Sequence, residues 1–148
     1  MAGAVISAKG AANSFQLRKV GAATPSQASD LSSETAEMPS KTYQTYTKTN
    51  LETDQVYTGR TSGTGTPEQN IARRDAKHHK NGEGYGPAQL DQSSSSPEAI
   101  RGREQRLIDF HGGAKSDQGT SGNAIRGVAK DNPKADRYYE AADLEFGQ

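Results

Sequence analysis

Cysteine and tryptophan are absent from this 148-residue chain, and only 30% of its residues are hydrophobic. Without cysteine the chain forms neither a disulfide nor a thiolate zinc site, and the redox compartment stays open. No run approaches the roughly 18 consecutive apolar residues of a membrane-spanning helix. The first residues also lack the sustained apolar stretch of a secretory signal. Such a composition supports a small core that is concentrated in a few segments.

An excess of charge of either sign is also missing, since 18 Lys and Arg balance 18 Asp and Glu. This balance is unlike that of a protein that binds nucleic acid over its whole surface, but it allows a local basic cleft. From Arg60 to Lys80 there are five Lys or Arg and two acids, with two histidines in the same stretch. We expect a phosphate backbone to bind there.

The first part of the chain, residues 1–40, is predicted to be a flexible linker. It is rich in Ala and Ser, carries Phe15 as its one aromatic residue, and is broken by Pro25 and Pro39. Such segments offer little apolar surface to offset the entropy of ordering. The folded domain is therefore predicted over residues 41–148.

The remainder predicts an α+β domain, a short antiparallel sheet flanked by about three helices. Residues 42–49 and 55–61 alternate Thr and Tyr with polar residues around the turn sequence NLETD, which indicates a β-hairpin. Helices are predicted over 67–79, over 97–111 and after Pro133. A further short extended piece is expected between residue 121 and that last helix.

Local signals mark the ends of the first two helices. Thr66 and Ser96 are the expected N-caps, and each is followed by a proline in the first helical turn. Gly112 and Gly113 are expected to end the second helix. Its buried face is predicted from Ile100, Leu107 and Ile108, with Phe110 as a further candidate.

Two tyrosine motifs in the predicted hairpin resemble those of the GIY-YIG nucleases. Gln44-Thr45-Tyr46 corresponds to GIY and Tyr57-Thr58-Gly59 to YIG, with ten residues between the tyrosines. Both motifs lack the isoleucine, and the first lacks the glycine. Downstream the order of the family continues over about residues 41–130, with Arg60, Arg73, Arg74, His78, His79, Glu104 and Asn123.

The resemblance implies a metal-dependent endonuclease that hydrolyses phosphodiester bonds. Its implied catalytic residues are Tyr46, Tyr57, Arg60, Arg74, His78, Glu104 and Asn123, and its implied substrate-binding residues are Gly59, Arg73, Lys77 and His79. One carboxylate, Glu104, would hold a hydrated Mg²⁺ or Mn²⁺, because Mg²⁺ keeps several waters and needs few protein ligands. The arginines would clamp phosphate oxygens, and a tyrosine would deprotonate or align the water. Gly59 would let the scissile strand approach the backbone.

Each residue taken alone also fits a structural role. The tyrosines are typical of strand aromatics that pack on a helix, and Arg73, Arg74 and Lys77 fit a solvated helix face. Asn123 fits a turn or a cap. Glu104 fits an exposed helical carboxylate, although its spacing from Leu107 and Ile108 places it at the edge of the buried face.

Two other functions remain open. An HNH-type nuclease would use the pair His78 and His79, with His111 as the one other histidine. Here the pair is expected at a helix C-terminus, where a protonated imidazole is also favourable. In the GIY-YIG interpretation Arg74 and His78 lie one turn apart on one helix face. The third possibility is a non-catalytic adaptor on a degraded nuclease fold, which binds protein or nucleic acid.

The setting is inferred by analogy. A small nuclease domain behind an Ala/Ser-rich linker resembles the C-terminal toxin modules of bacterial polymorphic toxins of the Rhs type. This resemblance implies a secreted effector that acts in the cytoplasm of a target bacterium, with DNA as substrate and RNA not excluded. It also implies a cognate immunity protein with an acidic surface over the basic cleft.

Overall fold

The sheet is three-stranded and wholly antiparallel. The computed structural model describes residues 40–147, so the linker predicted for 1–40 lies, except for Ser40, outside the described residues. Strands β2 (Thr42–Thr49), β3 (Val56–Gly63) and β4 (Gln89–Ser94) occur in the order β3-β2-β4. The predicted α+β class, with a hairpin, one further strand and three α-helices, is confirmed.

The hairpin forms around Asn50, as the turn sequence predicts. Its side-chain oxygen accepts hydrogen bonds from the backbone N–H groups of Glu52 (2.9 Å) and Thr53 (3.0 Å). Asp54 then takes a positive φ of 62°, a conformation that Asp tolerates better than most residues. The resulting register places Tyr46 opposite Gly59 and Lys48 opposite Tyr57.

The third strand is β4, and the expectation of an extended piece after residue 121 is wrong. The sequence of β4, QLDQSS, has little hydrophobic content, so its pairing with β2 stabilises it more than its own propensity does. The register passes from Thr45 opposite Gln92 to Tyr46 opposite Leu90, which leaves Asp91 as the extra residue of a β-bulge.

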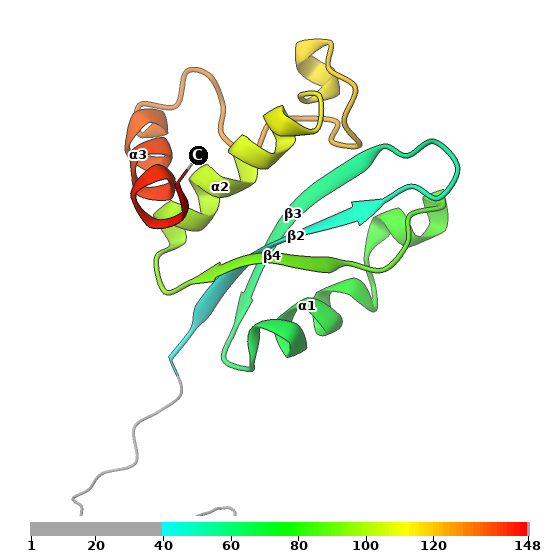
Figure 1. Ribbon diagram of the computed structural model, residues 1–148, viewed down its shortest axis with the longest axis horizontal. Helices are drawn as coiled ribbons and strands as arrows, with labels where there is room; N and C mark the ends of the chain where they lie inside the picture. Colours follow the sequence, from blue (N-terminus) through cyan, green and yellow to red (C-terminus); the bar gives the residue numbers. More distant parts are fainter. Residues whose placement is uncertain (1–39, 148) are drawn as a thin grey trace, which may run out of the picture. The chain divides into compact units, whose positions relative to one another are not determined.

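The helices lie on both faces of the sheet (Figure 1). Helix α1 (Pro67–Asp75) contacts the face that carries Gln44, Tyr46 and Lys48, whereas α2 (Pro97–Phe110) covers the opposite face and α3 (Ala135–Phe146) packs on α2. Two 3₁₀ helices, η1 (His79–Glu83) and η2 (Lys115–Asp117), lie in the connections. Within residues 40–147 no helix has the length and apolar character needed to cross a bilayer.

The helix ends follow the local sequence. Thr66 Oγ1 accepts from the Gln69 N–H (3.1 Å) while the Gln69 side chain accepts from the Thr66 N–H (2.9 Å), which completes a capping box. Ser96 caps α2 through the Ala99 N–H (3.1 Å). After α2, Gly112 and Gly113 take φ values of 114° and 88°, which glycine adopts without a steric penalty.

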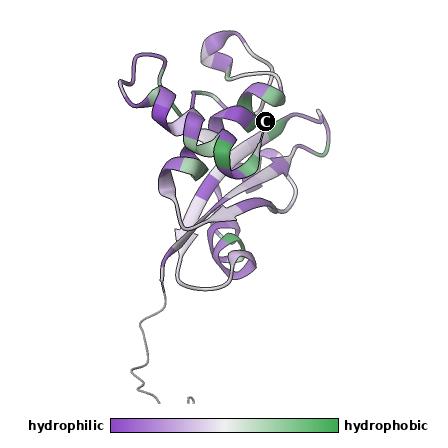
Figure 2. Cartoon of the chain, turned by 60° about the vertical axis from the view of Figure 1, so that its left-hand side comes forward, coloured by the Kyte–Doolittle hydropathy of each residue, from purple (hydrophilic) through white to green (hydrophobic). Residues whose placement is uncertain are grey.

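The core is small and partly polar. Ile100, Leu107 and Ile108 are buried as predicted, but Phe110 is 80% exposed, because no described element covers this last residue of α2. Hydrophobic residues gather on the helices, while the Thr- and Gln-rich strands are of intermediate hydropathy (Figure 2). Several buried side chains are therefore polar and paired, among them Gln44 and Asn70, which share a 3.1 Å hydrogen bond.

Candidate active site

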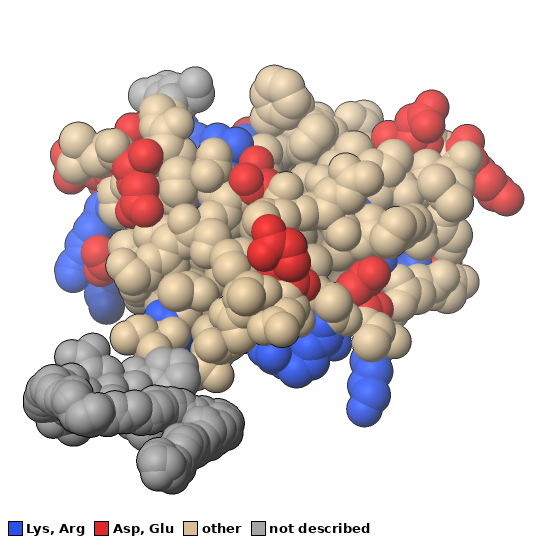
Figure 3. All heavy atoms as spheres, turned by 60° about the horizontal axis from the view of Figure 1, so that its bottom comes forward, with Lys and Arg blue, Asp and Glu red and all other residues tan. Residues whose placement is uncertain are grey.

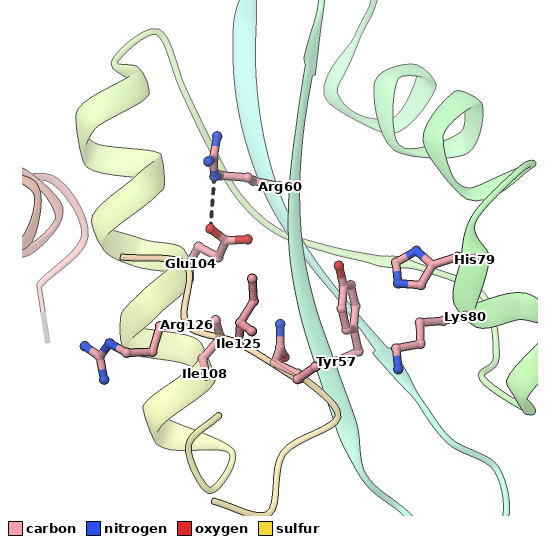
Figure 4. A pocket seen from close by; sticks show the side chains of 11 residues that line it. Tyr57, Arg60, His79, Lys80, Glu104, Ile108, Ile125 and Arg126 are labelled. Atoms are coloured by element: carbon pink, nitrogen blue, oxygen red, sulfur yellow. Dashed lines mark hydrogen bonds and ion pairs between the residues drawn. The ribbon is translucent and has the colours of Figure 1, made fainter. Parts of the chain in front are cut away.

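A pocket of about 480 Å³ opens at the outer edge of β3, where the two faces of the sheet meet. It is lined from four elements: β3, η1, α2 and the loop 123–127 (Figure 4). The lining residues are Tyr57, Arg60, His79, Lys80, Glu104, Ile108, Asn123, Ala124, Ile125, Arg126 and Gly127. Four residues of the predicted catalytic set thus share one cavity: Tyr57, Arg60, Glu104 and Asn123.

Glu104 supplies the carboxylate of this pocket. It projects from α2 and is only 8% exposed, at the edge of the buried face as its spacing predicts. Arg60 Nε donates a hydrogen bond of 2.9 Å to Glu104 Oε1, and the other carboxylate oxygen points toward Tyr57 (Figure 4). Burial raises the pKa of Glu104, and the positive charge of Arg60 opposes that rise.

Arg60 keeps donors available beyond this pair. Its guanidinium contributes only Nε to Glu104, and its side chain is 46% exposed. A guanidinium carries five N–H donors in a planar fork that matches carboxylate and phosphate oxygens. Arg60 can therefore hold Glu104 and a phosphate oxygen at the same time.

Tyr57 lies on the η1 side of the pocket. Its ring packs edge-on against His78 and His79, with ring centroids 5.1 and 5.6 Å away. Burial raises the pKa of Tyr57 to about 12, and the neighbouring Tyr46 and Glu104 add to the rise. The phenol is therefore protonated at neutral pH and acts there as a hydrogen-bond donor rather than as a base.

Tyr46 lies behind the pocket wall and is 1% exposed. Its ring occupies the space beside Gly59, where a Cβ would be 2.5 Å from the phenol oxygen. Gly59 is therefore needed for the packing of Tyr46, and close approach of the scissile strand at Gly59 stays a prediction. Burial raises the pKa of Tyr46, while Arg74 lowers it through a hydrogen bond and its charge.

His78 does not belong to α1, so the prediction of Arg74 and His78 on one helix face is wrong. Helix α1 ends at Asp75, and His78 is the N-cap of η1. His78 Nδ1 accepts the Lys80 backbone N–H (3.1 Å), so the neutral ring carries its proton on Nε2 and donates it to Tyr46 Oη (2.9 Å). Burial lowers the pKa of His78 to about 4, and the charges of His79 and Arg74 contribute.

A buried ion pair fixes the segment that carries His78. Lys48, whose side chain has no exposed surface, pairs with Asp75 and donates to Asn81 Oδ1 (2.7 Å). Asn81 Nδ2 in turn donates to the Asp75 carbonyl (2.7 Å), and its backbone N–H donates to the His78 carbonyl (3.1 Å). The end of α1 and the start of η1 are thereby tied to the middle of the sheet.

The remaining predicted residues fall into different places. Arg74 is exposed, and its charge acts on Tyr46, Tyr57 and His78, so it lies beside the site without lining the pocket. His79 lines the pocket and stacks on His78 with ring centroids 4.6 Å apart. Arg73 instead donates to the Ser62 carbonyl (2.9 Å) at the far end of β3, and Lys77 is exposed outside the pocket.

Asn123 lines the pocket, but its amide is used within the fold. Its Oδ1 accepts the Thr58 N–H and its Nδ2 donates to the Thr58 carbonyl, both at 2.8 Å. The neighbouring Gly122 N–H donates to the Val56 carbonyl (2.7 Å). Asn123 thus completes the outer edge of β3, and the interpretation as a structural residue fits the geometry better than a catalytic role.

The donor set determines what kind of cation site is feasible. Among residues 40–147 no cluster of three or more His, Asp or Glu side chains converges on one point. The ligand set that an HNH-type site requires of His78, His79 and His111 is therefore not assembled in the described part. Glu104 alone fits a hard, hydrated cation such as Mg²⁺, which would keep most of its ligands as water or phosphate oxygens.

The positive charge of the site is local. Figure 3 views the side on which α1 lies, and this side carries acidic as well as basic side chains, with the blue groups at its borders. The pocket itself is lined by three basic residues, Arg60, Lys80 and Arg126, and a single carboxylate, which Arg60 already neutralises. Each of these cations is paired with a carboxylate, Arg60 with Glu104, Lys80 with Glu83 (3.1 Å) and Arg126 with Asp117 (2.7 Å), so an anion would bind through donors that the pairs leave over.

Five pocket residues are absent from the predicted site residues and the predicted buried face: Lys80, Ala124, Ile125, Arg126 and Gly127. Lys80 directly follows the two histidines, so the basic stretch from Arg60 to Lys80 could have identified it as a site residue. Ile125 and Arg126 lie in a loop whose sequence shows no periodicity, and only its attachment to β3 and α2 brings them here.

Comparisons of the chain with protein-family models, with curated proteins and with solved structures found no match. The relation to the GIY-YIG nucleases therefore stays a resemblance of motifs.

Proposed function

We propose that residues 41–148 form a metal-dependent endonuclease that hydrolyses phosphodiester bonds of DNA. One observation supports this most directly: Glu104, Tyr57 and Arg60 come from α2 and β3 and line a single pocket. A carboxylate, a neutral phenol and a guanidinium are the groups that cation binding, water positioning and phosphate neutralisation require.

The arginines take the phosphate in this proposal. Arg60 has free donors above Glu104, and Arg74 is exposed beside the two tyrosines. A guanidinium neutralises a phosphate and fixes its orientation through paired hydrogen bonds. Replacing Arg74 with Lys keeps the charge but loses this geometry, so cleavage should fall about ten-fold or more, as 1.4 kcal/mol of lost stabilisation gives.

Tyr57 positions the water rather than deprotonating it at neutral pH, whereas the buried Tyr46 supports the pocket wall from behind. Hydrolysis forms a bond from the water oxygen to phosphorus, breaks the bond to the leaving oxygen, and delivers a proton to that oxygen. Tyr57 is protonated with a pKa of about 12, and Tyr46 accepts a hydrogen bond from His78 Nε2. His78 thereby holds the Tyr46 oxygen in place behind Gly59.

The second oxygen of Glu104 is the group that would hold Mg²⁺ or Mn²⁺. A cation at this point supplies positive charge to the phosphate and makes nearby water more acidic. Because burial raises the pKa of Glu104, cation binding should weaken at a higher pH than it would at an exposed glutamate, as the carboxylate takes up a proton.

The test is plasmid cleavage by the purified domain in Mg²⁺, in Mn²⁺ and in EDTA. We expect nicked or linear DNA in either metal and none in EDTA. Glu104→Gln should reduce the rate by at least about 100-fold, since metal-based charge stabilisation contributes several kcal/mol. Glu98→Gln is the matched control on the same helix, because Glu98 is half-buried outside the pocket and pairs with Arg137 (3.1 Å).

Intact DNA and RNA with every divalent ion would refute the nuclease proposal and favour the adaptor. Equal rates for wild type and Glu104→Gln would remove Glu104 from the mechanism. RNA cleavage without DNA cleavage would change the substrate and keep the chemistry.

We further propose that the protein is an antibacterial effector and that an immunity protein neutralises it. The locally basic pocket and the resemblance to polymorphic toxin tips support it, with an acidic partner surface as the expected complement. Expression of the domain alone in the bacterial cytoplasm should arrest growth, and Glu104→Gln should relieve the arrest. Normal growth with soluble, active wild-type protein would contradict the toxin role.

A further inference from the structure

The pocket beside Glu104 is chemically two-sided. Its polar side consists of Tyr57, Arg60, His79, Lys80 and Glu104, and its other side is formed by Ile108 and the loop residues 123–127. Figure 4 shows Ile125 between α2 and Tyr57, close below Glu104 in this view. A phosphate would contact only the polar side. The other side can contact a less polar part of the same ligand.

Ile125 is the main apolar group of that second side. It is 71% exposed, whereas Ile108 beneath it is 1% exposed. Burying the apolar surface of such a side chain away from water is favourable by about 25 cal/mol for each Å². A ligand that covers Ile125 therefore gains binding energy that a simple anion cannot.

Arg126, although it lines the pocket, is not available as a phosphate ligand. Its guanidinium donates to Asp117 Oδ2 (2.7 Å), to Tyr139 Oη (3.0 Å) and to the Val128 carbonyl (2.7 Å). Asp117 neutralises its charge at the same time. The charge that attracts phosphate is thus confined to the polar side, around Arg60.

The loop holds Ile125 in a fixed place. On one side of it Asn123 binds the Thr58 backbone, and the Ala124 carbonyl accepts the Ser116 N–H (2.9 Å). On the other side Gln105 Oε1 accepts the N–H groups of Gly127 (2.9 Å) and Val128 (3.0 Å). An apolar group that is ordered before binding loses little entropy when a ligand covers it.

The size of the pocket limits the ligand. A volume of about 480 Å³ falls in the range of roughly 300–1,000 Å³ that small-molecule sites occupy. It suits one nucleotide unit and not a base pair that remains stacked within a duplex. A base that enters must first leave its stack, as it does in enzymes that act on flipped or single-stranded nucleotides.

We propose that this pocket is a nucleotide subsite that takes one unpaired base against Ile125 while Arg60 holds the adjoining phosphate. The inference rests on the proposed nuclease function and specifies its substrate as an unpaired strand or an extruded nucleotide. Because an aliphatic side chain contacts the base by its face, the subsite should accept different bases.

The test is binding in EDTA, so that no cleavage occurs. The probes are a fluorescein-labelled tetrathymidylate and a tetramer of the same charge whose bases are replaced by abasic tetrahydrofuran units, with affinity read by fluorescence anisotropy. Wild type should bind the base-containing probe about five- to ten-fold more tightly, as expected if the base covers roughly 40–55 Å² of the apolar surface of Ile125 at about 25 cal/mol per Å². Ile125→Ala should abolish the difference between the two probes.

Leu144→Ala is the matched control, since Leu144 is also an exposed aliphatic residue (86%) but lies on α3 outside the pocket. It should keep the full preference. Equal affinity of wild type for the two probes, a preference that survives in Ile125→Ala, or no measurable binding of either probe would each overturn the subsite. Plasmid cleavage in Mg²⁺, measured on the same preparation, decides the nuclease proposal independently of this result.

Discussion

His78 should make the folded state sensitive to acid. Its pKa is about 4 in the fold, against about 6.5 for a histidine in an unfolded chain. The unfolded chain therefore binds the proton more readily, and the folded state loses stability as pH falls from 6.5 toward 4. With 1.36 kcal/mol for each pH unit, the loss between pH 7 and pH 5 is at most about 2 kcal/mol.

The main cause of the low pKa of His78 is burial of its ring, and the hydrogen bond that Nδ1 accepts acts in the same direction. A proton on Nδ1 would oppose the Lys80 N–H that now points at it, and it would place a charge near Arg74 and Lys48. The opposing attraction of Asp75 is the smallest of these effects. The neutral form with its proton on Nε2 is the one that binds Tyr46.

The measurement is urea unfolding at pH 7, 6 and 5 for wild type and His78→Gln. Glutamine does not titrate and keeps an amide donor for Tyr46. The difference in unfolding free energy between wild type and His78→Gln should change by up to about 2 kcal/mol over this range. An equal pH dependence in the two proteins would refute the reasoning, as would an NMR titration that places the pKa of His78 at or above 6.5.

Two further predictions concern stability and use the same unfolding assay. Gly102→Ala should lower the free energy of unfolding by at least about 2 kcal/mol, because the added Cβ would overlap the Tyr138 carbonyl of α3, and this outweighs the roughly 1 kcal/mol by which alanine is favoured over glycine in a helix. Gly82→Ala is the control and should change stability little, since no atom lies within 4 Å of the added Cβ. A Gly102→Ala variant more stable than wild type would contradict the packing of α2 on α3. Lys48→Met should lower the free energy of unfolding by about 3 kcal/mol, because it leaves the Asp75 carboxylate without its ion-pair partner. The double variant Lys48→Met, Asp75→Leu should regain much of this stability. If the losses of the two single variants simply add in the double variant, the pair is not coupled.

The sequence by itself determined the elements whose signals are local. The capping residues Thr66 and Ser96, the turn at Asn50 and the two glycines after α2 act on residues at most a few positions away. Hydrophobic spacing in α2 likewise placed Glu104 at the edge of the buried face. The same spacing wrongly suggested that Phe110 is buried, because spacing along one helix does not show where the neighbouring elements end.

The tertiary structure decided everything that depends on contacts between distant segments. Strand β4 has little strand character of its own and exists because β2 offers a partner. The Arg60–Glu104 pair joins residues 44 apart, and the bonds between Thr58 and Asn123 span 65. The motif order anticipated that Tyr57, Arg60 and Glu104 belong together, but the tautomer of His78, the use of Asn123 as an edge for β3 and the exposure of Ile125 follow only from packing. Short-range signals fix which backbone conformation a segment adopts, whereas the surroundings of a side chain depend on segments that the fold brings to it.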